Sequence, residues 1–318
     1  MTVTLITGAN KGLGYETARQ LIEHGHTVSM GARSIERGEA AATRLGAQFV
    51  QLDVTDDASV EAALLAIDER EGHLDVLVNN AGMSATADVD GPIALKVFNT
   101  NVIGVIRVTQ AALPLLCKSE NPVVVNVSSA LGSFWAVTNP ERLPFRYPAI
   151  MYGASKAAVS MLTVQYAKAL PEIKFNAVEP GFTATDLTPF SSAGQPVETG
   201  AEVIVRMATI GKDGPTGTFQ ENGGELAWSC RTTAGCRKRP GKPRGSRAAV
   251  ERSPCIACQS EGTEVDVLDQ SPVQEHKEVG DNAGGARREP LVGSSRRPEV
   301  GLLREDIGPI YLFVVEAR

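Results

Sequence analysis

Tyr152 and Lys156 stand four residues apart in the stretch MYGASKAAV, residues 151–159. On a helix this spacing places both side chains on one face, about one turn apart, so that a phenol and an ammonium group would meet the same ligand. A cation beside a phenol stabilises the phenolate and lowers the pKa of the phenol, which makes it a useful proton donor or acceptor. The same spacing is also common as a half-buried ring beside a solvated charge, so its meaning depends on the surrounding elements.

A glycine-rich segment, TGANKGLG, follows the first apolar run and contains Gly8, Gly12 and Gly14. Glycines between a strand and a helix let the backbone approach a ligand closely, and the N–H groups at the helix start attract phosphate. The segment is therefore predicted to bind phosphate. Its G-x-x-x-G-x-G spacing departs from the commoner G-x-G-x-x-G fingerprint, and a tight glycine turn without a ligand is the alternative.

The elements that would position these groups alternate along the chain from residue 1 to residue 228. Apolar runs such as residues 3–8 and 122–129 are separated by helical patterns such as residues 14–25 and 157–170. Continuous apolar strands between amphipathic helices are typical of a parallel sheet covered on both faces. The sequence predicts an α/β fold, a Rossmann-type doubly wound parallel sheet forming a single domain over residues 1–228.

The composition changes at residue 229. Residues 229–318 are rich in Arg, Gly, Pro and Ser and show no sustained helical or strand period. Such a segment cannot bury enough apolar surface to offset its ordering cost, so a low-complexity, largely disordered C-terminal tail is predicted. An exception is the apolar stretch at residues 307–318, which could add a strand to a sheet edge.

Charge and hydrophobicity exclude several function classes. The chain carries a net charge of −6, and since residues 229–318 hold 15 Lys and Arg against 13 Asp and Glu, the part before residue 229 carries −8. An acidic domain is a poor partner for a phosphate backbone, so no nucleic-acid binding is expected. No apolar run is long enough to span a bilayer and no leader pattern opens the chain, so a cytoplasmic protein without a membrane partner is expected.

Cysteines are concentrated in the tail. Only Cys117 lies before residue 229, which suits a reducing compartment, whereas Cys230, Cys236, Cys255 and Cys258 lie after it. A zinc site around the single C-x-x-C was weighed as an alternative, but no histidine lies near it and the other spacing is five residues. No metal site is predicted.

Five segments together resemble a known family. They are TGANKGLG, NNAG at residues 79–82, NVSS at 126–129, YGASK at 152–156 and PGFTAT at 180–185. In order and rough spacing they are similar to the motifs of the short-chain dehydrogenase/reductases, and most like those of the NADPH-dependent carbonyl-reductase branch. The resemblance covers residues 1 to about 228.

The resemblance implies an NADP-dependent oxidoreductase that reduces the carbonyl of an aldehyde or ketone to an alcohol. Tyr152 would be the acid and base, Lys156 would lower the pKa of Tyr152 and bind the nicotinamide ribose, and Ser129 would orient the substrate oxygen. Asn101 would anchor a water in the proton relay, although a helical asparagine can simply bond to backbone. A non-catalytic NADP(H)-binding redox sensor is the alternative function.

Two choices remain within these motifs. The family serine is usually followed by two residues and a glycine, which favours Ser129 over Ser128, and Ser128 is expected to support the turn. Asp53, after the third apolar run, resembles the family residue that contacts adenine, but a plain strand-end cap is the alternative.

Cofactor preference is indicated by the residues after the second apolar run. Ala32 stands where NAD-binding domains place an acid for the ribose 2′-hydroxyl, and Arg33 follows it. Arginine accommodates a 2′-phosphate, and Lys11 adds a second cation, so NADP(H) is the expected cofactor. The resemblance gives the following cofactor-binding residues: Gly8, Asn10, Lys11, Gly12, Leu13, Gly14, Arg33, Asp53, Val54, Asn80, Ala81, Gly82, Tyr152, Lys156, Pro180, Gly181, Thr183 and Thr185.

An insertion separates the serine from the tyrosine. Twenty-two residues lie between Ser129 and Tyr152, about ten more than the family usually has, and they include Phe134, Trp135 and Phe145. These aromatic residues could line the pocket for a bulky carbonyl substrate, form a surface flap that packs on itself, or block a subunit contact. The sequence therefore leaves open whether the protein is a monomer or a homo-oligomer.

Overall fold

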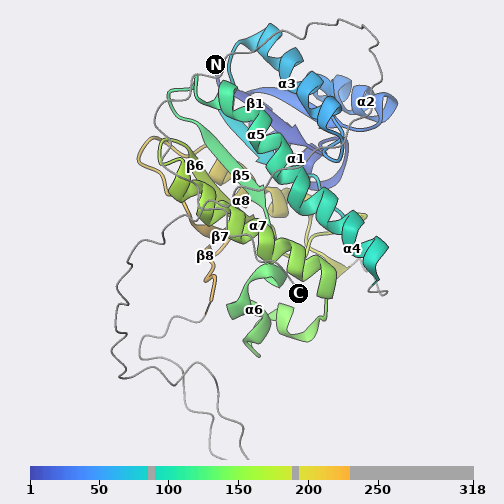
Figure 1. Cartoon of the computed structure of the whole chain (residues 1–318), viewed down its shortest axis with the longest axis vertical. Coiled ribbons are helices and arrows are strands. Elements are labelled where there is room, and N and C mark those ends of the chain that lie inside the picture. The colour runs from blue at the N-terminus through green and yellow to red at the C-terminus, as the bar shows by residue number, and fades with distance from the viewer. Residues whose placement is uncertain (85–89, 188–192, 230–318) are drawn as a thin grey trace, which may run out of the picture. The chain divides into compact units, whose positions relative to one another are not determined.

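The computed structural model describes residues 1–84, 90–187 and 193–229 (Figure 1). Most of the tail predicted for residues 229–318, with its apolar end and its four cysteines, lies outside the described residues. Within them, no three metal-ligating side chains come together and no helix is long and apolar enough to cross a membrane.

Eight described strands form one sheet in the order β3-β2-β1-β4-β5-β6-β7-β8. The neighbours from β3 to β7 pair in parallel, and only β8 runs antiparallel to β7. The change of direction between β1 and β4 is the strand-order reversal of a doubly wound sheet, which confirms the predicted Rossmann-type fold. The strands are β1 (Val3–Thr7), β2 (Thr27–Ala32), β3 (Gln48–Gln51), β4 (Val76–Asn79), β5 (Val123–Val127), β6 (Lys174–Glu179), β7 (Phe219–Glu221) and β8 (Gly224–Glu225).

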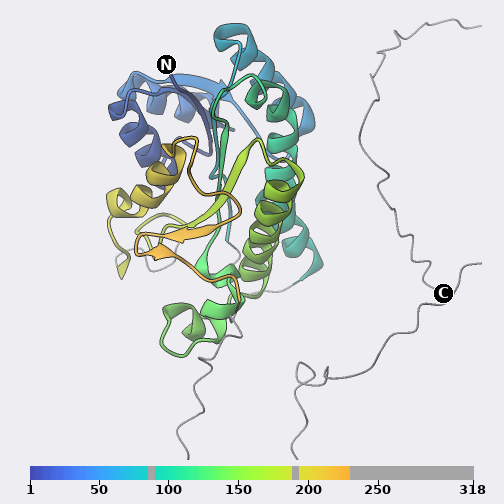
Figure 2. The same ribbon diagram turned by 90° about the vertical axis from the view of Figure 1, so that its left-hand side faces the viewer.

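Helices cover both faces of the sheet, as Figure 2 shows. Side chains of α1, α2 and α8 share one hydrophobic cluster with the sheet, and those of α3, α5 and α7 share the cluster on the other face. β1 and β5 are buried along their whole length, which explains their continuous apolar sequences. The helices are α1 (Gly12–Glu23), α2 (Ile35–Leu45), α3 (Asp57–Glu71), α4 (Gly91–Phe98), α5 (Gly104–Leu116), α6 (Phe134–Thr138), α7 (Ile150–Ala169) and α8 (Val197–Ala208).

Three short helical turns complete the described fold. A π-helical turn, η1 (Asn99–Ile103), joins α4 to α5, and the 3₁₀ turns η2 (Ala130–Gly132) and η3 (Leu143–Arg146) lie on either side of α6. The insertion found in the sequence forms α6 and η3, at the lower end of the molecule in Figure 1.

The end of the described chain closes the core beside the insertion. Leu226 is buried, and the Trp228 ring stacks on Phe219 with the ring centres 4.9 Å apart. The Ser133 hydroxyl, at the start of α6, donates a 2.6 Å hydrogen bond to the Ala227 carbonyl. Residues 226–228 are therefore part of the folded domain.

We expect a chain that ends at Trp228 to melt within about 5 °C of the full chain, because Leu226 and Trp228 complete this packing. A chain that ends at Glu225 should melt more than about 5 °C lower, since it loses both side chains. Thermal unfolding followed by circular dichroism would compare the three. If the chain ending at Trp228 also falls by more than about 5 °C, residues beyond it contribute to the fold.

Candidate active site

The predicted site residues gather at the carboxyl ends of the central strands. The glycine loop follows β1, residues 80–82 follow β4, Ser129 follows β5 and Pro180 follows β6. This edge of an open α/β sheet, where the strand order reverses, is where ligands bind in such folds. Motifs that are far apart in the sequence are thereby brought to one place.

The glycine loop packs against the segment that follows β4. The Asn80 side-chain amide donates to the carbonyls of Thr7, at 2.8 Å, and Gly8. A Cβ atom on Gly14 would lie 2.5 Å from the Asn80 side-chain nitrogen, and one on Gly8 would lie 3.0 Å from the Ala81 Cα. The two motifs thus depend on each other, and Gly8 and Gly14 are needed for this close approach.

Asn10, Leu13 and Gly82, which are also predicted to bind the cofactor, differ in burial and neighbours. Asn10 is half-buried in the turn before α1, and Leu13 packs against the hydrophobic cluster beneath α1. A Cβ on Gly82 would lie 3.6 Å from the Lys156 side-chain nitrogen, so this glycine borders the candidate catalytic residues.

The amino end of α1 is open to an anion. No described side chain caps this helix at Lys11, and its first turn contains no acidic residue. Ser34, Asp56 and Asp90 cap α2, α3 and α4 with their side chains, whereas α7 and α8 resemble α1 in having no side-chain cap. Uncapped N–H groups and the positive end of the helix dipole fit a phosphate group, so the chain's residues suit a dinucleotide here.

Lys11 forms an exposed ion pair across the edge of this loop. Its ammonium group lies 2.7 Å from a carboxylate oxygen of Asp186, and it holds the pKa of that carboxyl below its usual value. Asp186 belongs to the segment after β6 that also contains Thr183 and Thr185, and a Cβ on Gly12 would lie 3.5 Å from the Thr185 methyl group. The two segments predicted to bind the cofactor thus lie against each other.

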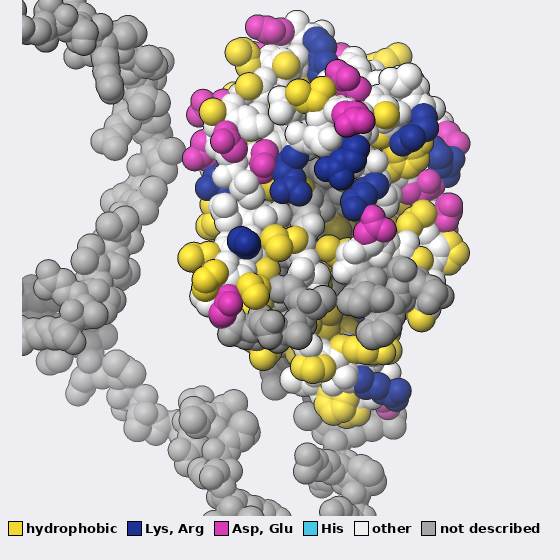
Figure 3. Space-filling view, turned by 90° about the vertical axis from the view of Figure 1, so that its right-hand side faces the viewer, with side chains coloured by type: hydrophobic (Ala, Val, Ile, Leu, Met, Phe, Trp, Pro, Cys, Tyr) yellow, Lys and Arg dark blue, Asp and Glu magenta, His cyan; other side chains and the backbone are white. Residues whose placement is uncertain are grey.

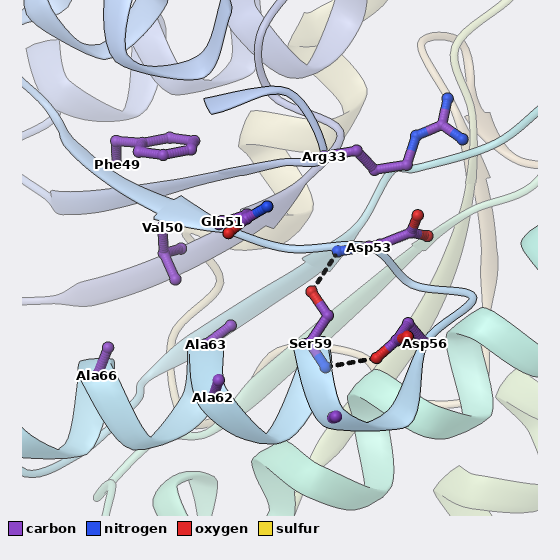
Figure 4. Close-up of a pocket in the computed structure, with 11 residues that line it drawn as sticks. Arg33, Phe49, Val50, Gln51, Asp53, Asp56, Ser59, Ala62, Ala63 and Ala66 are labelled. Atoms are coloured by element: carbon purple, nitrogen blue, oxygen red, sulfur yellow. Dashed lines mark hydrogen bonds between the residues drawn. The ribbon is translucent and has the colours of Figure 1, made fainter. Parts of the chain in front are cut away.

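A cavity of about 700 Å³ lies at the end of β3, lined by Arg33 and Asp53 among others (Figure 4). Arg33 is exposed, and no described residue forms a hydrogen bond or ion pair with its side chain. Asp53 accepts bonds from the Thr55 amide and hydroxyl at 2.9 and 2.7 Å. The cap that sequence analysis weighed as an alternative for Asp53 is therefore present.

Val54 is predicted to contact the cofactor, but its side chain is buried in the core, where a Cβ on Gly104 would approach it to 2.8 Å. Only the backbone of Val54 is left for a ligand.

Ser128 and Ser129 have different surroundings. Ser128 is buried, and its hydroxyl donates to the Lys156 carbonyl at 3.0 Å and lies 2.9 Å from the Ser160 hydroxyl. Ser129 is half-buried and accepts a 3.2 Å bond from the Leu131 amide, and hydrogen bonding to it lowers the pKa of Tyr152. The choice of Ser129 over Ser128 stays a prediction.

Gly132 explains the glycine that follows the serine. A Cβ on Gly132 would lie 2.5 Å from the carbonyl carbon of Lys156 and 2.6 Å from the Ala157 nitrogen. Turn η2 therefore rests directly on the backbone of α7, one turn beyond Tyr152. This close approach sets the separation between the serine and the tyrosine.

Lys156 is 4% exposed, and its ammonium group donates a 2.7 Å bond to the Val127 carbonyl and lies 5.6 Å from the centre of the Tyr152 ring. Burial lowers the pKa of Lys156 to about 8, although the negative charge of Glu179 acts to raise it. Burial and the Glu179 charge raise the pKa of Tyr152, and its bond with Ser129 acts in the opposite direction. Burial is the largest influence on the Tyr152 pKa, so its direction is opposite to the lowering predicted from the sequence.

Asn101 lies in η1, and its side chain is fully engaged with protein. Its amide donates to the Met83 carbonyl at 2.9 Å and the Ser155 hydroxyl at 3.0 Å, and its oxygen accepts from the Met83 amide at 2.8 Å. The backbone bonding weighed as the alternative is present. π-Helical turns are frequent at functional sites, and this one directs Asn101 towards α7.

Glu179, which ends β6 and is buried, is not among the residues predicted from the sequence. The residue stands in the run NAVEPG, where an acid in an apolar strand was the available signal. A buried polar ladder is also absent from that prediction; in it Asn79 donates to Asn126 and Asn126 donates to Thr163, both at 2.9 Å. The ladder ties β4 and β5 to α7.

The insertion is tethered and only partly exposed. Arg142 forms an ion pair with Glu221 of β7 and lies 5.3 Å above the centre of the Trp135 ring, which packs on a small hydrophobic cluster. Phe134 and Phe145 are 68% and 50% exposed. Hydrophobic side chains also gather at the lower end of the face in Figure 3, where the insertion lies.

Comparison with known proteins identifies the family. The sequence profile described as short chain dehydrogenase matches residues 2–196. The chain belongs to this family. Short-chain dehydrogenases are oxidoreductases that act on alcohol and carbonyl groups.

Curated relatives and solved structures are consistent with this family assignment. A short-chain dehydrogenase/reductase, ATR10, of Stachybotrys chlorohalonatus is 35% identical over 69% of this chain and 87% of its own length. (−)-Isopiperitenone reductase of Mentha piperita is 32% identical over 68% of this chain and 94% of its own. The NADPH-bound carbonyl reductase from chicken fatty liver superposes with a TM-score of 0.62 at 27% identity, covering 72% of this chain and all of that one.

In this short-chain dehydrogenase, we expect Gly132→Ala to lower the unfolding free energy by ~1–3 kcal/mol, because the new methyl group would overlap the α7 backbone. Gly91→Ala is the matched control, since a Cβ there meets nothing within 4 Å and its φ is ordinary. Urea denaturation of both variants gives the comparison. Equal stability of the two would show that η2 does not press on α7.

Proposed function

We propose that the protein is an NADPH-dependent carbonyl reductase that converts an aldehyde or ketone to an alcohol. The observation that carries the proposal is the grouping of Ser129, Tyr152 and Lys156 where β5 ends, on the edge of the sheet that also presents the uncapped start of α1. The relatives named as reductases support this direction of the reaction.

Each residue would have a distinct role. Reduced nicotinamide, when bound, supplies a hydride to the carbonyl carbon. The Tyr152 hydroxyl would give its proton to the carbonyl oxygen, on which negative charge develops, and the Ser129 hydroxyl would hold that oxygen. The raised pKa of Tyr152 keeps the phenol protonated at neutral pH, as an acid for reduction must be.

Lys156 would act on both partners of the reaction. Its buried ammonium group lies beside the Tyr152 ring and close to Gly82, where the ribose of a dinucleotide would bind. A cation there would stabilise the phenolate left after proton transfer. Asn101 would assist by holding the first turns of α7 through Ser155.

NADP(H) is proposed as the cofactor for its 2′-phosphate. Arg33 is exposed and lines the cavity at the end of β3, and position 32 holds an alanine where NAD-binding domains have an acidic residue. Lys11 lies at the start of α1. Three structural neighbours that are 27 or 28% identical to this chain have titles that name NADP or NADPH, which supports the choice.

A screen of NADPH oxidation by the purified protein tests the function. The panel should contain aldehydes, aromatic ketones, quinones, hydroxysteroids in the reverse direction, and isopiperitenone. The exposed Phe134 and Phe145 lead us to expect bulky apolar carbonyls to react best. NADPH binding without turnover of any compound would instead favour the redox-sensor function.

Replacing Tyr152 with Phe should lower kcat by ~10²- to 10⁴-fold, because one positioned acid is lost, while NADPH affinity stays close to that of the wild type. Steady-state kinetics and NADPH fluorescence titration measure the two quantities. Retention of more than about a third of wild-type kcat would exclude Tyr152 as the acid.

Replacing Arg33 with Ala should narrow the preference for NADPH over NADH by roughly tenfold or more in kcat/KM, since a charge-assisted bond to phosphate contributes on the order of 1.5–3 kcal/mol. Arg37→Ala is a suitable control, because Arg37 is exposed on α2 nearby but does not line the cavity. A wild-type protein that uses both cofactors equally would contradict the assignment.

A further inference from the structure

Glu179 joins two loops that meet at the proposed reduction site. It is the last residue of β6 and is 9% exposed. One carboxylate oxygen accepts a hydrogen bond from the Ala130 amide, in the turn after Ser129, and the other accepts a 3.1 Å bond from the Gly181 amide. A single side chain thus connects the loop after β5 with the turn after β6.

Ala130, whose amide bonds to the carboxylate, directly follows Ser129, and hydrogen bonding to the Ser129 hydroxyl lowers the pKa of Glu179. A hydroxyl has one proton to donate, so a Ser129 that donates to a charged Glu179 has none left for a substrate oxygen. A protonated Glu179 can instead donate to Ser129 and leave the serine proton free for the substrate. The protonation state of Glu179 therefore determines what Ser129 can offer.

We propose that Glu179 is a positioning residue for carbonyl reduction, which fixes the Ser129 loop against the turn at Gly181 and, in its protonated form, directs the Ser129 hydroxyl towards the substrate. The proposal rests on the function proposed above. It assigns no contact with the substrate to Glu179 itself.

In the described part of the chain, four charged or titratable groups interact electrostatically with Glu179. They are Tyr152 and Lys156 of α7, Glu221 of β7 and Arg142 of the insertion. Arg142 is paired with Glu221, so it leaves little charge to balance Glu179. Glu179 is thus a buried acid without an ion-pair partner of its own among the described residues.

Its ionisation should fall in the physiological range. Burial raises the pKa of Glu179 to about 7, and the bonds from Ala130 and Gly181 oppose that rise. Reduction that needs the protonated form should decline as the pH rises above about 7, by about tenfold for each further pH unit.

The test compares Glu179→Ala and Glu179→Gln with the wild type in the full chain, with NADPH saturating and pH varied from 5.5 to 8.5. Glu179→Ala should lower kcat/KM on the order of 100-fold at pH 6, because both loops lose their tie. Glu179→Gln should recover only part of the wild-type activity at pH 6, because its oxygen can still accept one of the two backbone bonds and its NH2 group can donate to Ser129 but cannot accept the second backbone bond. Its profile should lack the decline that begins near pH 7, so that any decline left begins only near the Lys156 pKa of about 8.

Glu221→Gln is the matched control. It removes a neighbouring carboxylate that does not touch the Ser129 loop and that raises the pKa of Glu179. This variant should keep the decline and move it to slightly lower pH. The proposal is overturned if Glu179→Ala stays within threefold of the wild type, or if Glu179→Gln keeps the wild-type decline.

A second measurement does not need turnover. Between pH 4.5, the usual pKa of the carboxyl, and about 7, the unfolded chain releases the Glu179 proton before the folded one does. The wild type should therefore lose stability relative to Glu179→Gln as the pH rises, and the gap in Tm should widen up to about pH 7. Parallel Tm curves would overturn the role of Glu179, whereas a wild type that reduces no carbonyl would overturn only the proposed function.

Discussion

The close contact between turn η2 and helix α7 fixes the geometry on which the site depends. Gly132 lies so near the Lys156 backbone that no side chain fits between them, and Ser128 bonds to the Lys156 carbonyl. Tyr152 is held in the first turn of α7 and Ser129 at the end of β5. Because both candidate residues belong to elements that press on each other, the separation of their hydroxyl groups does not depend on long flexible side chains.

Three ionisable groups share the buried space behind this contact. Burial disfavours the charged forms of Tyr152, Lys156 and Glu179 alike. It therefore raises the pKa of Tyr152 and of Glu179 and lowers that of Lys156, and each shift favours the neutral form. A neutral phenol is ready to donate a proton, whereas the reverse oxidation of an alcohol needs the phenolate. In the proposed reduction the Tyr152 hydroxyl would donate its proton, which requires the neutral phenol that burial favours.

Much of the fold and of the site could be predicted from the sequence. The alternation of apolar runs and helical patterns is a local property, and the spacing of Tyr152 and Lys156 within one helix is as well. Contacts between elements were harder to predict. The tie from Glu179 to Ala130 and the ladder from Asn79 to Asn126 exist because β4, β5 and β6 are neighbours, which no local pattern encodes.

The contacts of the insertion were also hard to predict from the sequence. The insertion packs next to the residues around Glu179. In a helix as short as α6, sequence does not reveal which aromatic faces inwards, and the structure buries Trp135 partly while leaving Phe134 exposed. Ser133 caps α6 directly after η2, so the insertion begins where the Ser129 loop ends. Its other anchor, Arg142, pairs with the Glu221 that acts on Glu179. Both anchors of the insertion thus lie next to residues that surround Glu179.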